Sequence, residues 1–144
     1  MSFSLDVNIL LYASDSSSAQ HRTAAELLAS VADGNEACYI SWLTAMSYLR
    51  MATHPRLFAA PLSQQQAENN INDLMGRPHV HCIAEGDDFW DVYREVAGEI
   101  PVRGNLVPDA HLAALLRQHG IRTLYTHDRD FLKFPFLRIV DPFE

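Results

Sequence analysis

The sequence lacks several features that would mark large classes of protein. It has two cysteines, Cys38 and Cys82, and no C-x-x-C pair, which excludes a disulfide framework and a four-cysteine zinc site and fits a reducing cytoplasm. No apolar run approaches the roughly 20 residues that a membrane-spanning helix needs. No G-x-G-x-x-G follows the first predicted strand, which disfavours a dinucleotide-binding enzyme. The residues before Asp6 carry no basic segment, so we expect no signal peptide.

Positive charge is also scarce. Eleven lysines and arginines oppose eighteen aspartates and glutamates, for a net charge of −7. A protein that binds nucleic acid through phosphate contacts alone usually carries a basic face. The partner is therefore not nucleic acid, or a cation lies among the acids and supplies the missing positive charge.

The chain alternates short apolar runs with helical periods. At 144 residues, 48% apolar and 20% charged, it is predicted to form a single globular domain over residues 1–144. The predicted strands are residues 2–5, 37–41, 80–83, 123–126 and 137–140, and the predicted helices are residues 7–13, 21–32, 42–52, 64–75, 87–97 and 108–119. Strands separated by helices indicate an α/β fold, with a short central parallel sheet of four to five strands and helices on both faces.

Three aspartates fall where such sheets bind ligands. Asp6 follows the first predicted strand, Asp128 follows the fourth, and Asp109 lies in the first turn of a helix. In a doubly wound sheet all three can meet at the carboxyl edge. Clustered carboxylates repel each other, and a hard cation such as Mg²⁺ removes that cost, contacts phosphate and activates water. Each aspartate could instead be an N-cap or turn residue, and Asn8 could orient Asp6 or bond only to local backbone.

Several segments resemble the motifs of PIN-domain nucleases. Residues 5–12 (LDVNILLY) are similar to the opening motif of that family. Residues 105–114 (NLVPDAHLAA) are similar to its third-acid helix, and residues 126–131 (THDRDF) to its T-x-D-x-D-F segment. The segments that resemble one branch, the VapC-type toxins of bacterial toxin–antitoxin modules, are residues 41–42, 48–50 and 53–58. The resemblance covers nearly the whole chain in the right order.

This resemblance implies a PIN-like domain that acts as an endoribonuclease dependent on Mg²⁺ or Mn²⁺. It also implies a homodimer in the cytoplasm, held inactive by a cognate VapB-like antitoxin, with RNA as substrate and no membrane association. In this interpretation Asp6, Asp109 and Asp128 are catalytic, and Asp6 and Asp109 hold the metal. The supporting residues are Asn8, Ser47, Arg50 and Asp130.

One position departs from the family pattern. PIN nucleases usually carry a glutamate in the helix after the second strand, three residues before the place of Arg50. Ser47 takes that position, and no acid occurs between residues 37 and 53. Three acids should bind a second metal less well, so we expect one ion on Asp6 and Asp109, with Asp128 supporting it through water.

Two other functions fit parts of the sequence. A phosphatase of the haloacid dehalogenase type would need an aspartate where Asn8 stands and a downstream lysine, and Lys133 is the only lysine in the chain. A non-catalytic binding module, a nuclease fold that has lost acids, is favoured only by Ser47. A zinc site at His79 and His81 lacks a third ligand at suitable spacing, so both are predicted to be ordinary strand residues.

Two sets of apolar side chains have structural interpretations. Cys38 and Cys82 fall on strands that could be neighbours, and both are predicted to be buried as small hydrophobic residues. The aromatic residues in segments 42–49 and 89–93 are predicted to pack in the core or to form part of a dimer surface and an antitoxin groove.

Overall fold

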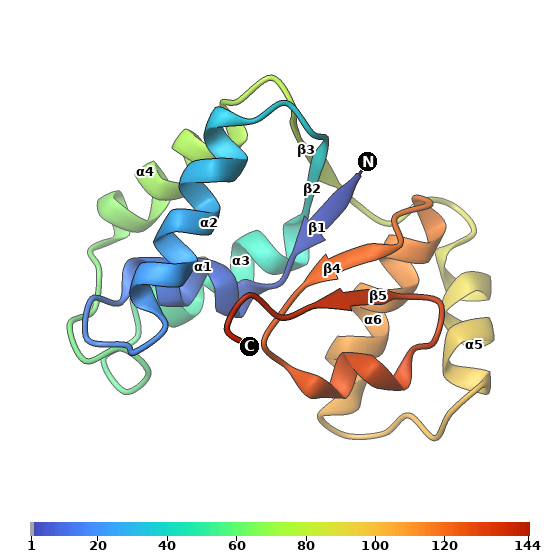
Figure 1. Cartoon of the computed structure of the whole chain (residues 1–144). Helices are drawn as coiled ribbons and strands as arrows, with labels where there is room; N and C mark the ends of the chain where they lie inside the picture. Colours follow the sequence, from blue (N-terminus) through green and yellow to red (C-terminus); the bar gives the residue numbers. More distant parts are fainter. Residues whose placement is uncertain (1) are drawn as a thin grey trace.

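The computed structural model describes residues 2–144, and its elements follow the predicted alternation (Figure 1). The strands are β1 (Phe3–Leu5), β2 (Cys38–Ser41), β3 (Val80–Ile83), β4 (Thr123–Tyr125) and β5 (Arg138–Val140). The helices are α1 (Val7–Ser14), α2 (His21–Asp33), α3 (Trp42–Ala52), α4 (Gln64–Met75), α5 (Phe89–Gly98), α6 (Leu106–Gln118) and the 3₁₀ helix η1 (Arg129–Lys133).

Within the described residues the strands form one parallel, five-stranded sheet in the order β3-β2-β1-β4-β5, which confirms the predicted α/β architecture. β1 lies at the centre, because Ser4 pairs with Tyr39 of β2 on one side and with Leu124 of β4 on the other. The chain runs outward from β1 to β3 and then returns to add β4 and β5 on the opposite side. The carboxyl ends of β1 and β4 therefore mark the switch point, where open parallel sheets bind ligands.

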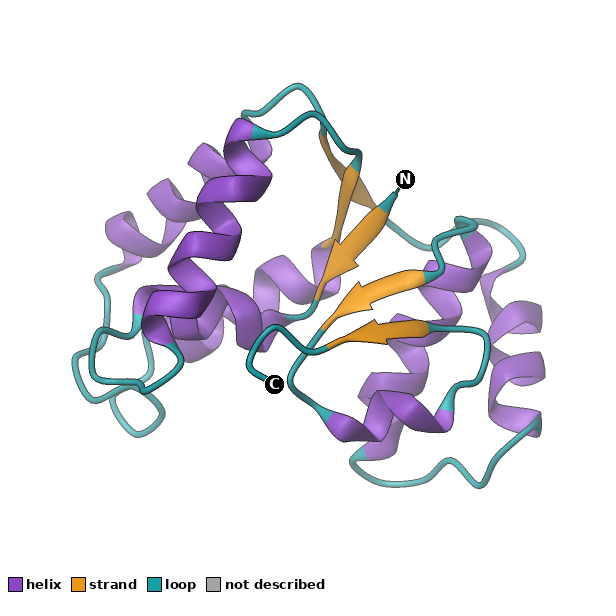
Figure 2. Cartoon of the chain, viewed as in Figure 1, coloured by secondary structure: helices purple, strands orange, loops and turns teal. Residues whose placement is uncertain are grey.

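Helices cover both faces of the sheet and enclose two hydrophobic clusters (Figure 2). The first cluster joins β1 and β2 to helices α1 to α4 and includes the buried Leu5, Ile9 and Ile40. The second joins β4 to α5, α6 and η1 and includes the buried Leu115 and Phe131. Each fully buried side chain of this kind contributes about 1.5–3 kcal/mol. Packing on both faces thus fixes the strand ends that lie between the two clusters.

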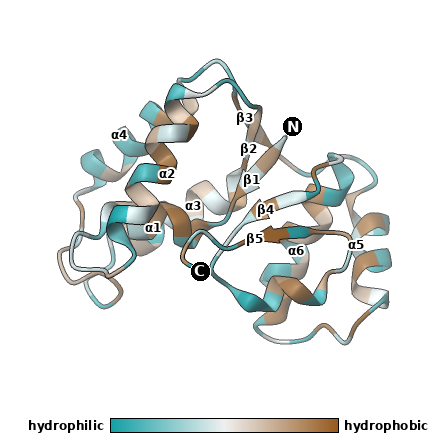
Figure 3. Ribbon diagram, viewed as in Figure 1, coloured by the Kyte–Doolittle hydropathy of each residue, from teal (hydrophilic) through white to brown (hydrophobic). Residues whose placement is uncertain are grey.

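Polar caps start the helices that follow the strands and loops. Ser41 Oγ accepts a hydrogen bond from the Thr44 backbone nitrogen (3.0 Å) at the start of α3. Ser63 and Gln66 form a capping box at the start of α4. Hydrophilic colour dominates the outer helix α4, whereas α6 is largely hydrophobic (Figure 3). The deep burial of α6 holds its first turn, which carries Asp109, in a fixed place beside the sheet.

Several predicted boundaries shift by one or two residues, and among them α6 begins at Leu106 and not at residue 108. The helix predicted from residue 87 begins at Phe89, because the Asp88 side chain does not cap it and accepts a hydrogen bond from Gln118 instead. The acidic turn predicted after β4 continues into η1, which the sequence analysis did not expect. The Asp128 side chain caps η1 by accepting a hydrogen bond from the Asp130 backbone nitrogen (2.9 Å).

The prediction of burial is confirmed for Cys38 and wrong for Cys82, which is exposed because β3 is an edge strand. His79 lies just before β3, and its Nε2 bonds to the Val31 carbonyl (2.6 Å), so it is not a strand residue.

The aromatic residues of α3 and α5 divide between core and surface. Tyr48 is buried in the core, whereas Trp42 and Trp90 are 46% and 65% exposed. Core packing therefore explains Tyr48, whereas much of the surface of both tryptophans remains exposed. No helix among residues 2–144 is long and apolar enough to cross a membrane.

Candidate active site

Asp6 joins the central strand to the first helix. Its backbone nitrogen donates to the Tyr125 carbonyl (3.0 Å), and its side chain caps α1 by accepting from the Val7 nitrogen (2.7 Å). The second carboxylate oxygen accepts from the Thr126 hydroxyl (2.8 Å) and from Asn8 Nδ2 (3.3 Å). With 8% exposure, Asp6 is a nearly buried acid whose two oxygens both have donors. The fold therefore fixes the direction of this carboxylate before any ligand arrives.

Asn8 and Thr126 tie the ends of β1 and β4 together. Asn8 Nδ2 also donates to Thr126 Oγ1 (3.0 Å), and Asn8 Oδ1 accepts from the His127 backbone nitrogen (3.3 Å). Thr126 Oγ1 accepts in addition from the Asp128 nitrogen (3.0 Å). These bonds give Asn8 the orienting contact with Asp6 that the sequence analysis considered. That analysis missed the part played by Thr126, although its place at the start of the THDRDF segment was a usable signal.

A second group of acids lies beside this network. Asp109, Asp128 and Asp130 each bring a carboxylate oxygen to within 4.8 Å of the others, a spacing that could hold a cation. Asp109 comes from the first turn of α6, and the other two come from the start of η1. Lys133 Nζ lies 3.3 Å from Asp130 and offsets part of the negative charge. This donor set consists of hard oxygens only, which suits Mg²⁺ or Mn²⁺ better than zinc.

The pKa values of Asp6 and Asp109 show that Asp6 and the cluster of Asp109, Asp128 and Asp130 interact electrostatically. Burial raises the pKa of Asp109 to about 7, and repulsion from Asp128, Asp6 and Asp130 adds to the increase, while Lys133 opposes it. Burial also raises the pKa of Asp6, against the hydrogen bonds from Thr126 and Val7, and Asp128 raises it further. Four carboxyls therefore repel one another at the switch point, and a bound cation would relieve that repulsion.

Two of the predicted residues lie apart from this cluster. Ser47 is half-buried and Arg50 is exposed, both on α3. Within residues 2–144, no hydrogen bond or ion pair links either side chain to Asp6, Asp109, Asp128 or Asp130. The structure thus brings together the acids and Asn8, and leaves Ser47 and Arg50 outside their bonded network.

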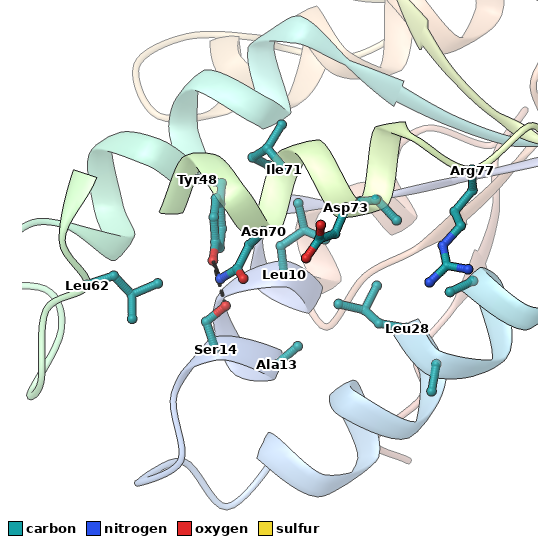
Figure 4. Close-up of a pocket in the computed structure, with 13 residues that line it drawn as sticks. Leu10, Ala13, Ser14, Leu28, Tyr48, Leu62, Asn70, Ile71, Asp73 and Arg77 are labelled. Carbon is teal, nitrogen blue, oxygen red and sulfur yellow. Dashed lines mark hydrogen bonds between the residues drawn. The ribbon is translucent and has the colours of Figure 1, made fainter. Parts of the chain in front are cut away.

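Away from the acids, a hollow of about 340 Å³ lies among α1 to α4 (Figure 4). Most of its lining is apolar, and Leu10 and Leu28 belong to it. At one end Tyr48 bonds to Ser14 (2.6 Å) and accepts from Asn70 Nδ2 (2.9 Å). We call this hollow the helical groove. It contains none of the four acids, so its chemistry suits an apolar segment rather than a cation.

A parallel sheet with acids clustered at its switch point is the architecture of a nuclease-type α/β domain. Residues 4–137 match the PIN domain, and the chain belongs to the PIN-domain family. The resemblance noted in the sequence is therefore confirmed at the level of the family.

Among individual relatives, Ribonuclease VapC48 of Mycobacterium tuberculosis is 48% identical over 143 residues, 99% of each chain. VapBC-1 from nontypeable Haemophilus influenzae has a TM-score of 0.70 at 20% identity and covers 100% of both chains. A toxin–antitoxin complex from Klebsiella pneumoniae has a TM-score of 0.63 at 22% identity, covering 98% of both chains. The two solved structures share the fold, and the first relative also shares nearly half of the sequence.

Proposed function

We propose that this chain is the toxin of a toxin–antitoxin module, an endoribonuclease of one PIN-like domain over residues 1–144 that acts in the cytoplasm. The convergence of four carboxyls at the ends of β1 and β4 and the first turn of α6 carries the proposal. The 48% identity to a protein named as a ribonuclease supports the reaction, RNA phosphodiester hydrolysis. Neither zinc nor dinucleotide chemistry has a comparable cluster within the described residues.

The proposed cofactor is Mg²⁺ or Mn²⁺. PIN-domain ribonucleases generally depend on a divalent metal, and the all-carboxylate donor set fits one. We assign metal binding to Asp6 and Asp109 and catalysis to these two with Asp128, and the oxygen spacing adds Asp130 as a further candidate ligand. A bound ion supplies a positive contact for phosphate and lowers the pKa of water for attack.

The surrounding residues hold this site in shape. Thr126 and Asn8 donate to Asp6, so its carboxylate keeps one orientation. Asp128 is fixed as the cap of η1, which sets the position of Asp130 next to it. The middle of α6, from Ala110 to Leu116, is largely buried, and this packing anchors the more exposed first turn that carries Asp109. The chain thus keeps repelling acids together, which is the arrangement a cation needs.

The direct test is cleavage of total cellular RNA by the purified chain in Mg²⁺ or Mn²⁺, compared with EDTA. Asp91→Asn is the matched control for Asp109→Asn, because Asp91 also lies in the first turn of a helix and is exposed. We expect cleavage that requires metal, survives Asp91→Asn and disappears in Asp109→Asn. Cleavage that persists in EDTA, or that is equal in both variants, would contradict the metal-nuclease function. The absence of cleavage under every condition would favour the non-catalytic binding module.

The proposed partner is a VapB-like antitoxin that places an apolar segment in the helical groove. The groove is mostly apolar, and Asp73 and Arg77 at its lining offer charges to the polar flanks of such a segment. Ala29 lines the groove and is exposed, so Ala29→Arg should block it without disturbing the core. Thr23→Arg, exposed on the same helix and outside the groove, is the control.

The measurement is copurification with the product of a small reading frame directly upstream of the gene. We expect Ala29→Arg to lose this partner and to keep RNA cleavage, whereas Thr23→Arg keeps both. If Ala29→Arg keeps the partner with unchanged affinity, the antitoxin binds elsewhere on the chain.

The proposed homodimer uses the exposed apolar residues of α3 and α5. Trp42, Met46 and Trp90 are 46%, 53% and 65% exposed, and Trp90 stacks on Tyr93 at 5.7 Å between ring centroids. Sedimentation at tens of micromolar (an order-of-magnitude choice of concentration) should show a dimer that Trp90→Ser weakens. Leu132→Ser, at a similarly exposed position in η1, should leave it intact. A wild-type chain that sediments only as a monomer would overturn the dimer.

A further inference from the structure

A small hollow with a mixed polar and apolar lining lies directly beside the acidic cluster. Its volume is about 140 Å³, and Thr126 and Asp128 line it together with His127, Arg129 and Asp141. Thr126 and Asp128 belong to the proposed catalytic site. An RNA chain bound at that site therefore passes next to this hollow. Pockets for whole small molecules are usually larger than about 300 Å³. The hollow therefore suits one unit of a polymer better than a free ligand.

His127 is held in this hollow from several sides. Its Nδ1 lies 2.8 Å from Asp141 Oδ2, and the other oxygen of Asp141 accepts from the Phe143 backbone nitrogen (2.9 Å). The imidazole packs edge-on against Phe143 and Tyr12, at 5.1 Å and 6.1 Å between centroids. The C-terminal segment thus returns to the ends of the central strands and fixes the ring (Figure 1). His127 has one orientation before substrate binds.

This orientation determines the hydrogen-bonding character of the remaining ring nitrogen. An ionised carboxylate only accepts hydrogen bonds, so Asp141 requires the hydrogen of a neutral imidazole to be on Nδ1. Nε2 is then an acceptor, and no residue among 2–144 donates to it. The backbone phosphates of a nucleic acid offer no hydrogen to such an acceptor. A ribose does, through its 2′-hydroxyl, which is the group that distinguishes RNA from DNA.

We propose that this hollow is a ribose subsite, in which His127 Nε2 accepts a hydrogen bond from one 2′-hydroxyl of the RNA and Asp141 acts as the positioning residue. The inference rests on the proposed ribonuclease function and names how that site selects RNA. Arg129 supports it, since its ion pair with Glu144 (3.2 Å) is exposed on both sides. An exposed pair contributes little, so a substrate phosphate can replace Glu144.

The test uses one cleavable RNA oligonucleotide and a series in which a single ribose at a time is replaced by 2′-deoxyribose or 2′-fluororibose. Steady-state cleavage gives kcat and KM for each, and fluorescence anisotropy gives binding. For the wild type we expect one position at which both replacements raise KM about 3- to 10-fold, the loss of one neutral hydrogen bond. The fluorine accepts but cannot donate, so it should be no better than hydrogen there.

Variants separate recognition from packing. His127→Phe keeps an aromatic ring against Tyr12 and Phe143, and it should abolish the difference between ribose and deoxyribose at that one position. His127→Gln retains an acceptor and should keep part of the difference. Asp141→Asn can donate to Nδ1, which frees the tautomer, and it should reduce the difference. Thermal melts establish that each variant folds.

The outcomes distinguish this inference from the proposed function. If the wild type cleaves RNA but His127→Phe leaves the position-specific ribose effect unchanged, the subsite is wrong and the ribonuclease function stands. If the wild type does not cleave, the same comparison in binding decides the subsite. If RNA and its single-deoxy versions bind alike, or do not bind, the subsite is also overturned.

Discussion

The end of β1 and the first turn of α6 present their aspartates in opposite ways. Asp6 is nearly buried, and both of its oxygens accept hydrogen bonds from the chain. Asp109 is half-buried, and within residues 2–144 no donor reaches its carboxylate. The first carboxylate is therefore oriented by hydrogen bonds that oppose the cost of its burial, whereas the second is destabilised by burial and by its neighbours without such donors. We infer from this contrast that, in the proposed site, Asp6 sets the geometry and Asp109 contributes the unbalanced charge that a cation would neutralise.

The largest expected effect is the same for both aspartates, because each contributes charge. Asp6→Asn and Asp109→Asn should each reduce RNA cleavage about a thousandfold. A unit charge about 4 Å from another interacts by about 4 kcal/mol at an effective dielectric of about 20, and this energy corresponds to roughly that rate factor. The measurement is kcat/KM on one RNA oligonucleotide, with Asp91→Asn as control. Wild-type activity in either variant, with contaminating nuclease excluded, would remove that residue from the site.

The next effect is on stability, where substitution of the two residues should change the free energy of unfolding in opposite directions. In EDTA, Asp6→Asn should lower the free energy of unfolding by about 1–3 kcal/mol, because the new amide presents hydrogens to the donors Thr126 and Asn8. Asp109→Asn should raise it at pH 8, because a repelled charge disappears. Solvent screens this half-exposed carboxyl, so we expect about 1 kcal/mol. Urea unfolding measures both, and equal signs would contradict the comparison.

A smaller effect should appear in the pH dependence of the metal-free chain. The pKa of Asp109 is raised to about 7 in the native state, above its ordinary value of about 3.9 in the unfolded chain. The native state therefore holds more protons between these values, so its stability falls as pH rises from about 4 to about 7 and changes little above that. Melting temperatures from pH 6 to 8 in EDTA should decline more for the wild type than for Asp109→Asn. Mn²⁺ should raise the wild-type melting temperature more at pH 8 than at pH 6, since metal and proton compete.

The smallest effect concerns Ser47. Ser47→Ala removes a hydroxyl that makes no contact with the acids, so cleavage should change less than twofold, in line with the roughly 0.5 kcal/mol limit of ordinary surface substitutions. Ser47→Glu supplies the acid that the family usually carries, and it should increase the affinity for Mn²⁺ measured by calorimetry. Unchanged Mn²⁺ affinity in Ser47→Glu would mean that this position of α3 lies too far from the cation.

The sequence predicted the elements of the fold and the positions of the site aspartates along them, but not how those aspartates are buried or bonded. Alternating strand and helix patterns predicted the sheet and put Asp6 and Asp128 at strand ends, because hydrophobic period and chain order are local properties. The burial of Asp6 and the raised pKa of Asp109 were not predictable, since they depend on which segments meet across the sheet. The contact of Thr126 with Asp6 spans 120 positions of the chain, and no local pattern encodes it.

Dependence on contacts between distant parts of the chain also explains why the edge position of β3 was not predicted. Strand order is decided by which faces the crossover helices cover, and a four-residue strand gives no sign of whether it has one neighbour or two. Residues 80–83 (VHCI) are apolar except for His81, yet only the two end residues are buried, so the sequence alone could not show that Cys82 would remain exposed.

The central position of β1 has a consequence for the order of events during protein synthesis. β1 is the first strand to leave the ribosome, yet its two neighbours begin at Cys38 and Thr123. Asp6 therefore waits for Thr126, its main side-chain donor, until all but the last 18 residues of the 144 have been translated. An incomplete chain that stops before β4 has neither Thr126 nor Asp128 to finish the acidic cluster. The proposed active site therefore cannot form in a nascent chain until β4 and the residues that follow it have been translated.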